Sequence, residues 1–178
     1  MKFGKKLVES GLTRSRFGNV SFRKDEDLMI ISRRGSMLDE LEGQLVEVPI
    51  FRTSELDGEA SIELPMHRRI YMKTPASFVF HAHPLFAVVL SLLTEEREIR
   101  PLDAESRSYL ERIPIIEGEA GSRELAESAA EILSSFPGAI IRGHGAVARG
   151  ASAAEAYEIL WAIEQACRIK YLVDLLRR

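Results

Sequence analysis

Two histidines separated by a single residue, His81 and His83, are the side chains in this sequence best suited to chemistry. Side chains alternate between the two faces of a strand, so a strand over 77–83 would point both imidazoles to the same side. Such a pair can supply two of the three protein ligands that a catalytic zinc ion needs. Taken alone, the motif is equally consistent with two half-buried strand histidines that make ordinary hydrogen bonds.

Three further positions could complete such a site. His144 lies between Gly143 and Gly145, which leave room for a backbone turn or a close ligand. Glu63 and His67 are four residues apart, so both would face one side of a helix that begins near Glu63. By themselves, a histidine between glycines is typical of a turn, and a Glu–His pair is typical of a salt bridge or a helix cap. Together with the first pair, they are a carboxylate and imidazoles spread over a helix start, a strand and a glycine-flanked loop.

The elements that must position these side chains are interspersed helices and strands. Apolar periodicity, with Pro65 suited to a first helical turn and Ser122 to an N-cap, defines them. Early hairpin-like strands argue against an all-parallel sheet, so the sequence favours an α/β sandwich with a mostly antiparallel or mixed sheet. The predicted helices span 3–12, 64–73, 85–93, 121–135 and 152–176, and the predicted strands span 18–24, 27–32, 44–51, 77–83, 113–116 and 136–143.

Composition narrows the class of protein. The 178 residues are 46% hydrophobic and 29% charged without a linker or repeat, which predicts a single domain over 1–178. A net charge of −3 disfavours nucleic acid as a partner. The sequence has neither a bilayer-spanning apolar stretch nor a signal-like start, so we expect no membrane association and a cytoplasmic location. The single Cys167 cannot form an internal disulfide or a thiolate zinc site, so any metal must be held by histidine and carboxylate.

Several motifs occur together in the order of a known family. The chain resembles the class II aldolase and adducin head family, specifically its fuculose-phosphate aldolase branch, over nearly its whole length. The motifs that carry the resemblance are GNVS at 18–21, the Gly35 turn after LMIISRR, ELPMHRRIY at 63–71, SFVFHAHPLFAVVLSLL at 77–93, GSRELAE at 121–127 and IIRGHGAVARGASAAEAY at 140–157.

The resemblance implies a three-layer sandwich in which helices flank a central, mostly antiparallel or mixed β-sheet. It also implies a divalent cation, usually zinc, held by His81, His83 and His144. Glu63 matches the family glutamate that neighbours the metal and acts as acid or base. His67 matches a further histidine, for which we expect a structural or orienting role because metal ligands usually need an orienting partner.

The resemblance further places Asn19 at a substrate phosphate, with the Gly35 turn and Ser61 as additional donors. Backbone amides in such turns suit an anion without a charged side chain. Arg34 and Ile62 depart from the family, which typically has a small hydroxyl residue and a serine at these positions. Arg34 could bind phosphate or carboxylate through its guanidinium group, or it could be a solvated surface cation.

The implied reaction is the reversible cleavage of a ketose 1-phosphate, such as L-fuculose 1-phosphate, to dihydroxyacetone phosphate and a short aldehyde. A methylthioribulose-1-phosphate dehydratase and a sugar-phosphate 4-epimerase are alternatives within the family. A non-catalytic adducin-like binding module is an alternative of another class, although it would lack the metal ligands that this chain retains. Characterised aldolases carry a tyrosine that 115–124 lacks, and the nearest one here is Tyr109.

Assembly is the remaining expectation. The resemblance implies a ring of four subunits with each active site at a subunit boundary. The apolar run over 85–93 and the long final helix give an independent reason, because a small chain has little surplus surface with which to enclose a deep pocket. We therefore expect a homotetramer.

Overall fold

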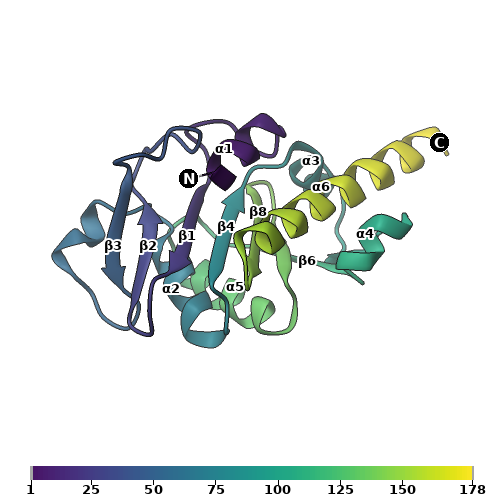
Figure 1. The fold of residues 1–178 in the computed structure, drawn as a ribbon. Helices are drawn as coiled ribbons and strands as arrows, with labels where there is room; N and C mark the ends of the chain where they lie inside the picture. Colours follow the sequence, from purple (N-terminus) through teal and green to yellow (C-terminus); the bar gives the residue numbers. More distant parts are fainter. Residues whose placement is uncertain (1, 178) are drawn as a thin grey trace.

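The computed structural model describes residues 2–177, which form a central eight-stranded sheet with the strand order β3-β2-β1-β4-β8-β7-β6-β5 (Figure 1). Neighbouring strands are antiparallel except for the β6–β7 pair. The strands are β1 (Asn19–Arg23), β2 (Leu28–Ser32), β3 (Leu45–Pro49), β4 (Phe78–Ala82), β5 (Glu98–Ile99), β6 (Ile113–Ile116), β7 (Gly138–Ile141) and β8 (Gly145–Gly150). The helices are α1 (Lys2–Glu9), the 3-10 helix η1 (Glu55–Gly58), α2 (Leu64–Lys73), α3 (Leu85–Leu93), α4 (Ala104–Tyr109), α5 (Arg123–Ser135) and α6 (Ala153–Leu176).

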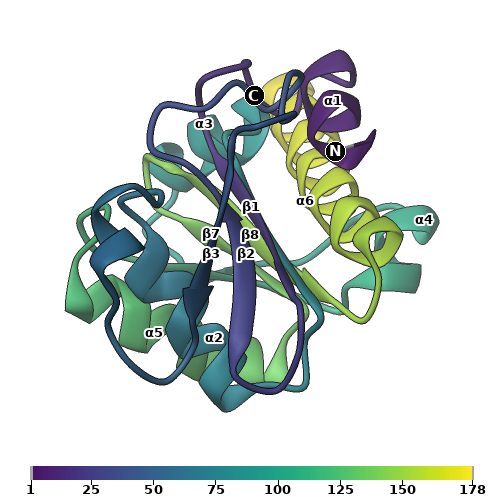
Figure 2. The same ribbon diagram turned by 60° about the vertical axis from the view of Figure 1, so that its left-hand side comes forward.

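Helices cover both faces of this sheet, which confirms the expected three-layer sandwich (Figure 2). The helices α2 and α5 pack together on one face, and their apolar side chains share a core with that face. The helices α1, α3 and α6 share a second core with the opposite face. The mostly antiparallel, mixed sheet also agrees with the expectation. Within residues 2–177, no helix is both long and apolar enough to cross a bilayer.

Alternation along β4 assigns its side chains to the two cores. Phe80 and Ala82 are buried in the core beneath α6, whereas Val79 is buried in the core beneath α2 and α5. His81 is two residues after Val79 and so shares its face. The first histidine of the pair therefore lies on the α2 side of the sheet, at the end of a central strand.

The main element that the sequence did not predict is β8. Gly145 suggests a loop, but here it begins a strand that pairs with both β4 and β7. A Cβ atom on Gly145 would clash with the carbonyl oxygen of Ala82, so glycine allows close approach of two central strands. The short elements β5 and α4 were not predicted either, and the first helix ends at Glu9 because Gly11 adopts a left-handed φ of 73°.

Candidate metal centre and active site

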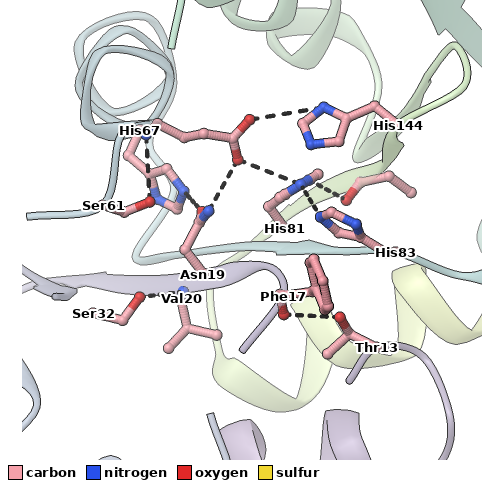
Figure 3. A network of polar contacts seen from close by, with 12 residues as sticks. Thr13, Phe17, Asn19, Val20, Ser32, Ser61, His67, His81, His83 and His144 are labelled. Carbon is pink, nitrogen blue, oxygen red and sulfur yellow. Dashed lines mark hydrogen bonds and ion pairs between the residues drawn. The ribbon is translucent and has the colours of Figure 1, made fainter. Parts of the chain in front are cut away.

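Three imidazole rings converge at one end of the central strands (Figure 3). The ring centroids of His81, His83 and His144 lie 4.7–4.9 Å apart, and one candidate ligand nitrogen from each lies within 4.8 Å of the others. The Nε2 atoms of His81 and His83 are 3.0 Å apart. Nδ1 of His81 donates to the carbonyl oxygen of Ala146 on β8, which leaves Nε2 free to bind a metal. These three histidines form a cluster that could hold a metal ion.

Helix α3 positions the two histidines that lie outside strands. His83 lies between the end of β4 and the start of α3, whose backbone N–H groups at Phe86 and Ala87 donate to the carboxylate of Glu164 on α6. His144 lies in the turn between β7 and β8, and the preceding Gly143 donates its N–H to Ser91 near the end of α3. Both ends of one helix thus fix parts of the histidine cluster.

The guanidinium group of Arg142 strengthens this second attachment. It donates to the backbone carbonyl oxygens of Ser91 in the last turn of α3 and of Thr94 and Glu96 just beyond it, and to the carboxylate of Glu117. The carbonyls at the end of a helix lack partners within the helix, so a side-chain donor satisfies them well. The turn that carries His144 is therefore tied to the helix that begins beside His83.

Glu63 directs its carboxylate toward the imidazoles. It occupies the N-cap position of α2 but makes no side-chain capping bond, and only 2% of the residue is exposed. Oε2 lies 3.4 Å from Nε2 of His81 and accepts a hydrogen bond from Asn19, whereas Oε1 lies 3.9 Å from Nδ1 of His144 and has no hydrogen-bond partner. Burial opposes ionisation, but His81, Asn19 and His144 outweigh it, so the pKa of Glu63 lies below its ordinary value.

The chemistry of this donor set fits a divalent cation. Burial, followed by the neighbouring His81 and His144, lowers the pKa of His83 to about 3. Burial and His81 also lower the pKa of His144. Neutral imidazole nitrogens and an ionised carboxylate are ligands that zinc accepts. The buried Oε1 of Glu63, which lacks a hydrogen-bond partner among residues 2–177, is the atom that a bound cation or a substrate proton would satisfy.

Asn19 is hydrogen-bonded to Glu63, and His67 is hydrogen-bonded to Asn19. Asn19 is 5% exposed, and its Nδ2 donates to Oε2 of Glu63 at 2.9 Å, while its Oδ1 lies 2.5 Å from Nε2 of His67. His67 is fully buried and is not one of the clustered imidazoles. The side chain expected at the phosphate thus already contacts the candidate acid/base through one of its two amide hydrogens.

A cavity of about 300 Å³ opens beside the histidines. Sequence analysis missed Arg16 and Phe17 on its wall: Nη1 of Arg16 donates to the carbonyl oxygen of Gly35, and the Phe17 ring lies 5.6 Å from that of His83. In the sequence, Arg16 could have been identified from its position, because it is a basic residue two positions before the GNVS motif that was assigned to the phosphate. Tyr109 ends α4 and does not line this cavity. The cavity brings together every site residue that the sequence predicted, namely Asn19, Arg34, Gly35, Ser61, Glu63, His81, His83 and His144.

The lining of the cavity is also basic, because it includes Arg16, Arg33 and Arg34. Arg33 is paired with Glu59, whereas Arg16 and Arg34 have no carboxylate within ion-pair distance among residues 2–177. Ser61 contributes a hydroxyl that accepts the backbone N–H of Glu63. The cavity lining therefore includes guanidinium groups as well as candidate metal ligands, a combination suited to a substrate with an anionic group.

Comparison with known proteins agrees with this geometry. Residues 1–171 match the model of the class II aldolase and adducin N-terminal domain. An L-fuculose phosphate aldolase of Methanococcus maripaludis is 29% identical, over 88% of this chain and 85% of its own length. A methylthioribulose-1-phosphate dehydratase of Pectobacterium carotovorum is 30% identical, over 89% of this chain and 84% of its own length.

Solved structures are also similar to this chain. The crystal structure of an L-fuculose-1-phosphate aldolase from Thermus thermophilus superposes with a TM-score of 0.91 at 31% identity, over 99% of this chain and 92% of that one. Aldolases and dehydratases both cleave a bond in their substrate by elimination, so these similarities support a lyase. The match over nearly the whole chain, the shared fold and the histidine cluster together show that the chain belongs to the class II aldolase and adducin N-terminal domain family.

Proposed function

We propose that the protein is a zinc-dependent aldolase that reversibly cleaves a ketose 1-phosphate, such as L-fuculose 1-phosphate, to dihydroxyacetone phosphate and a short aldehyde. The observation that carries this proposal is a buried carboxylate oxygen, Oε1 of Glu63, without a partner beside three clustered imidazoles. Relatives named for L-fuculose phosphate supply the substrate class.

In this proposal His81, His83, His144 and Glu63 would hold the cation. Zinc, or another divalent cation there, would act as a Lewis acid that stabilises negative charge developing on substrate oxygens. Nδ1 of His81 is engaged with a backbone carbonyl, so that ring is oriented before any ion binds. The buried position of His81 and Glu63 also limits access of water to the reacting end of the cavity.

Glu63 would also move the proton at the substrate carbon from which the aldehyde departs. Oε1 is the free oxygen, and the ionised state favoured by the surrounding groups makes it a base. In the cleavage direction, the carbon–carbon bond breaks as the hydroxyl group on the departing carbon gives up its proton and becomes the aldehyde carbonyl. An equivalent proton, taken up by the ionised Oε1 of Glu63, is passed to the remaining carbon to form the new C–H bond of dihydroxyacetone phosphate, which returns Glu63 to its ionised state. In the synthetic direction, Oε1 takes that proton back.

The anionic end of the substrate would bind at the basic part of the cavity lining. We assign the phosphate to Asn19, Arg34, Gly35 and Ser61, and add Arg16 because its guanidinium group contacts the Gly35 turn. Gly35 has a φ of 72°, and its backbone N–H, unlike those of Arg34 and Ser36, has no backbone acceptor among residues 2–177 and is suited to an anion. Charge-assisted bonds from the arginines would favour the phosphate dianion over a neutral sugar.

A second candidate reaction is dehydration of a methylthioribulose 1-phosphate, favoured by the relative that is 30% identical to this chain. A panel of ketose phosphates incubated with zinc-loaded protein separates the two reactions. The proposal expects release of dihydroxyacetone phosphate with retention of all substrate carbon and oxygen in the two products. Water loss without dihydroxyacetone phosphate would instead assign the dehydratase reaction, and epimerisation is monitored in the same mixtures.

We also propose that the active form is a homotetramer with the sites at subunit boundaries. Leu85, Leu92 and Leu93 on α3 are each more than 60% exposed, and Leu85 adjoins a surface hollow that contains His83 and Phe17. An apolar surface beside the site is suited to contact with another copy. With a chain of 20.0 kDa, light scattering should give about 80 kDa. A monodisperse 20.0 kDa species with full activity would contradict this assembly.

A further inference from the structure

A continuous row of buried hydrogen bonds runs from Tyr71, in the last turn of α2, to the candidate acid/base. The hydroxyl of Tyr71 lies 2.8 Å from Oγ of Ser21, which lies 2.6 Å from Nδ1 of His67. Nε2 of His67 lies 2.5 Å from Oδ1 of Asn19, and Nδ2 of Asn19 lies 2.9 Å from Oε2 of Glu63. All five residues are buried, so water does not substitute for these partners.

The partners at each step allow only one direction of donation. An ionised Glu63 only accepts, so Asn19 must present its NH₂ group to Glu63 and its carbonyl oxygen to His67. His67 must then donate from Nε2 and, as a neutral ring, accept at Nδ1 from the hydroxyl of Ser21. The hydroxyl of Tyr71 completes the row by donating to Ser21. Each of these four contacts thereby joins one donor to one acceptor.

This direction distinguishes the two oxygens of Glu63. Oε2 is held by Asn19, whereas Oε1 has no partner and lies on the side of His144. If the amide of Asn19 were turned over, its carbonyl oxygen would face the carboxylate and the two acceptors would repel. The carboxylate would then leave its position beside the imidazoles. The N–H group of His67 holds the other end of the amide, because it needs the carbonyl oxygen of Asn19 as its acceptor.

We propose that His67 is a positioning residue: by fixing the amide of Asn19 in one orientation, it holds Glu63 with Oε2 bound and Oε1 free to exchange a proton with the substrate. This rests on the role of Glu63 in the proposed function. The competing explanation is that His67 only fills space between α2 and the sheet. Replacement by glutamine and by leucine separates the two, because His67→Gln keeps a donor near the Nε2 position while His67→Leu keeps only apolar bulk.

The first measurement uses zinc-loaded protein without substrate. In wild-type protein, ¹⁵N NMR should show His67 protonated at Nε2 and not at Nδ1. The side-chain NH₂ of Asn19 should give two well-separated proton signals with slow solvent exchange. That protection should be lost in His67→Leu and kept in His67→Gln. An Nδ1–H tautomer in the wild type, or equal protection in both variants, would overturn the proposal.

The second measurement is turnover of the sugar phosphate. Partners that orient active-site groups typically contribute about 10- to 100-fold, so His67→Leu should lower kcat by that factor with little change in KM, and His67→Gln should recover most of it. Combining His67→Leu with Asn19→Ala should cost no more than Asn19→Ala alone, because both act through one bond. Equal losses in the glutamine and leucine variants, or multiplicative losses in the double variant, would show a space-filling role.

A matched control accounts for stability. Ile70 is fully buried on the same helix, and its side chain belongs to the apolar core, so Ile70→Val should weaken the fold without lowering kcat or the protection of Asn19. Tyr71→Phe, at the start of the row, should lower kcat less than His67→Leu, because Ser21 can still donate to the ring. If wild-type protein turns over no sugar phosphate, the proposed function fails, whereas the tautomer and amide measurements still decide the role of His67.

Discussion

The two faces of the central strands are built from opposite kinds of side chain. On the α6 face, Val20 of β1 and Phe80 of β4 are buried in an apolar core. On the α2 face of the same strands, Asn19, Ser21 and His81 are equally buried but polar. Adjacent residues of one strand therefore serve different purposes: one face supplies the hydrophobic stabilisation that permits the other to carry charged and hydrogen-bonding groups.

Most buried polar side chains on the α2 face have hydrogen-bond partners, but one carboxylate oxygen has none, and this exception indicates where the chemistry takes place. Next to α2, the side chains of Ser21, His67 and Asn19 are all hydrogen-bonded. Oε1 of Glu63, at the end of this row, is one of few buried side-chain atoms without a partner in the described chain. A buried atom left unpaired costs stability, so its position between a satisfied network and a histidine cluster is the mark of a functional group.

The largest expected effect is loss of metal from the polar face. Wild-type protein should bind about one divalent ion per chain, and His83→Ala should lose nearly all of it, because removing one of four ligands opens the site. Elemental analysis after dialysis measures this. His67→Gln is the matched control, since His67 lies outside the cluster and its replacement should retain the metal. Equal metal in wild type and His83→Ala would show that the ion binds elsewhere.

The apolar face should respond in stability and not in chemistry. Leu160 on α6 is fully buried in the core opposite the site, so Leu160→Ala should lower the free energy of unfolding by about 2–5 kcal/mol. Urea denaturation measures the loss, and kcat and metal content of the folded variant should remain at the wild-type level. A large fall in kcat would show that the two faces are coupled.

Glu63→Gln should give the reverse pattern. The glutamine keeps the shape and can still accept from Asn19, but it cannot carry the proton, so kcat should fall at least about 100-fold, equivalent to about 2.7 kcal/mol. The free energy of unfolding of the metal-free variant should change less than in Leu160→Ala, and it should fall, because the groups around Glu63 favour the ionised carboxylate over a neutral side chain. Normal turnover would place the base on another residue.

Near neutral pH, the smallest expected effect is a pH dependence of stability in metal-free protein. Complete burial lowers the pKa of His67 from 6.5 to about 3. Below pH 6.5 the unfolded chain therefore binds a proton that the folded chain excludes, and stability should fall by about 1.4 kcal/mol per pH unit from this residue until near pH 3. Urea unfolding at several pH values measures the slope. The slope should be shallower in His67→Gln, and an unchanged slope would contradict the buried neutral ring.

Local sequence was sufficient to predict an element where its hydrophobic periodicity or its start and stop residues were strong. The helix over 64–73 and the helix over 85–93 have the bounds predicted for them, since a proline opens each and a β-conformation residue ends it. The His81–Ala82–His83 spacing correctly placed two imidazoles on one side. β8 was missed because Gly145 carries the local signature of a loop, whereas its purpose is close contact with a strand more than 60 residues earlier.

The sequence by itself determined the types of ligand, the face of each one along its own element and, through motif order, the family. Tertiary structure alone decided which groups meet: antiparallel pairing of β4 with β8 sets the carbonyl of Ala146 on His81, and the turn before β8 delivers His144. It also turned Asn19 toward Glu63 and placed Arg16 on the cavity wall. The physical reason is that periodicity fixes a side chain relative to its own backbone, whereas strand pairing and helix docking fix one segment relative to another.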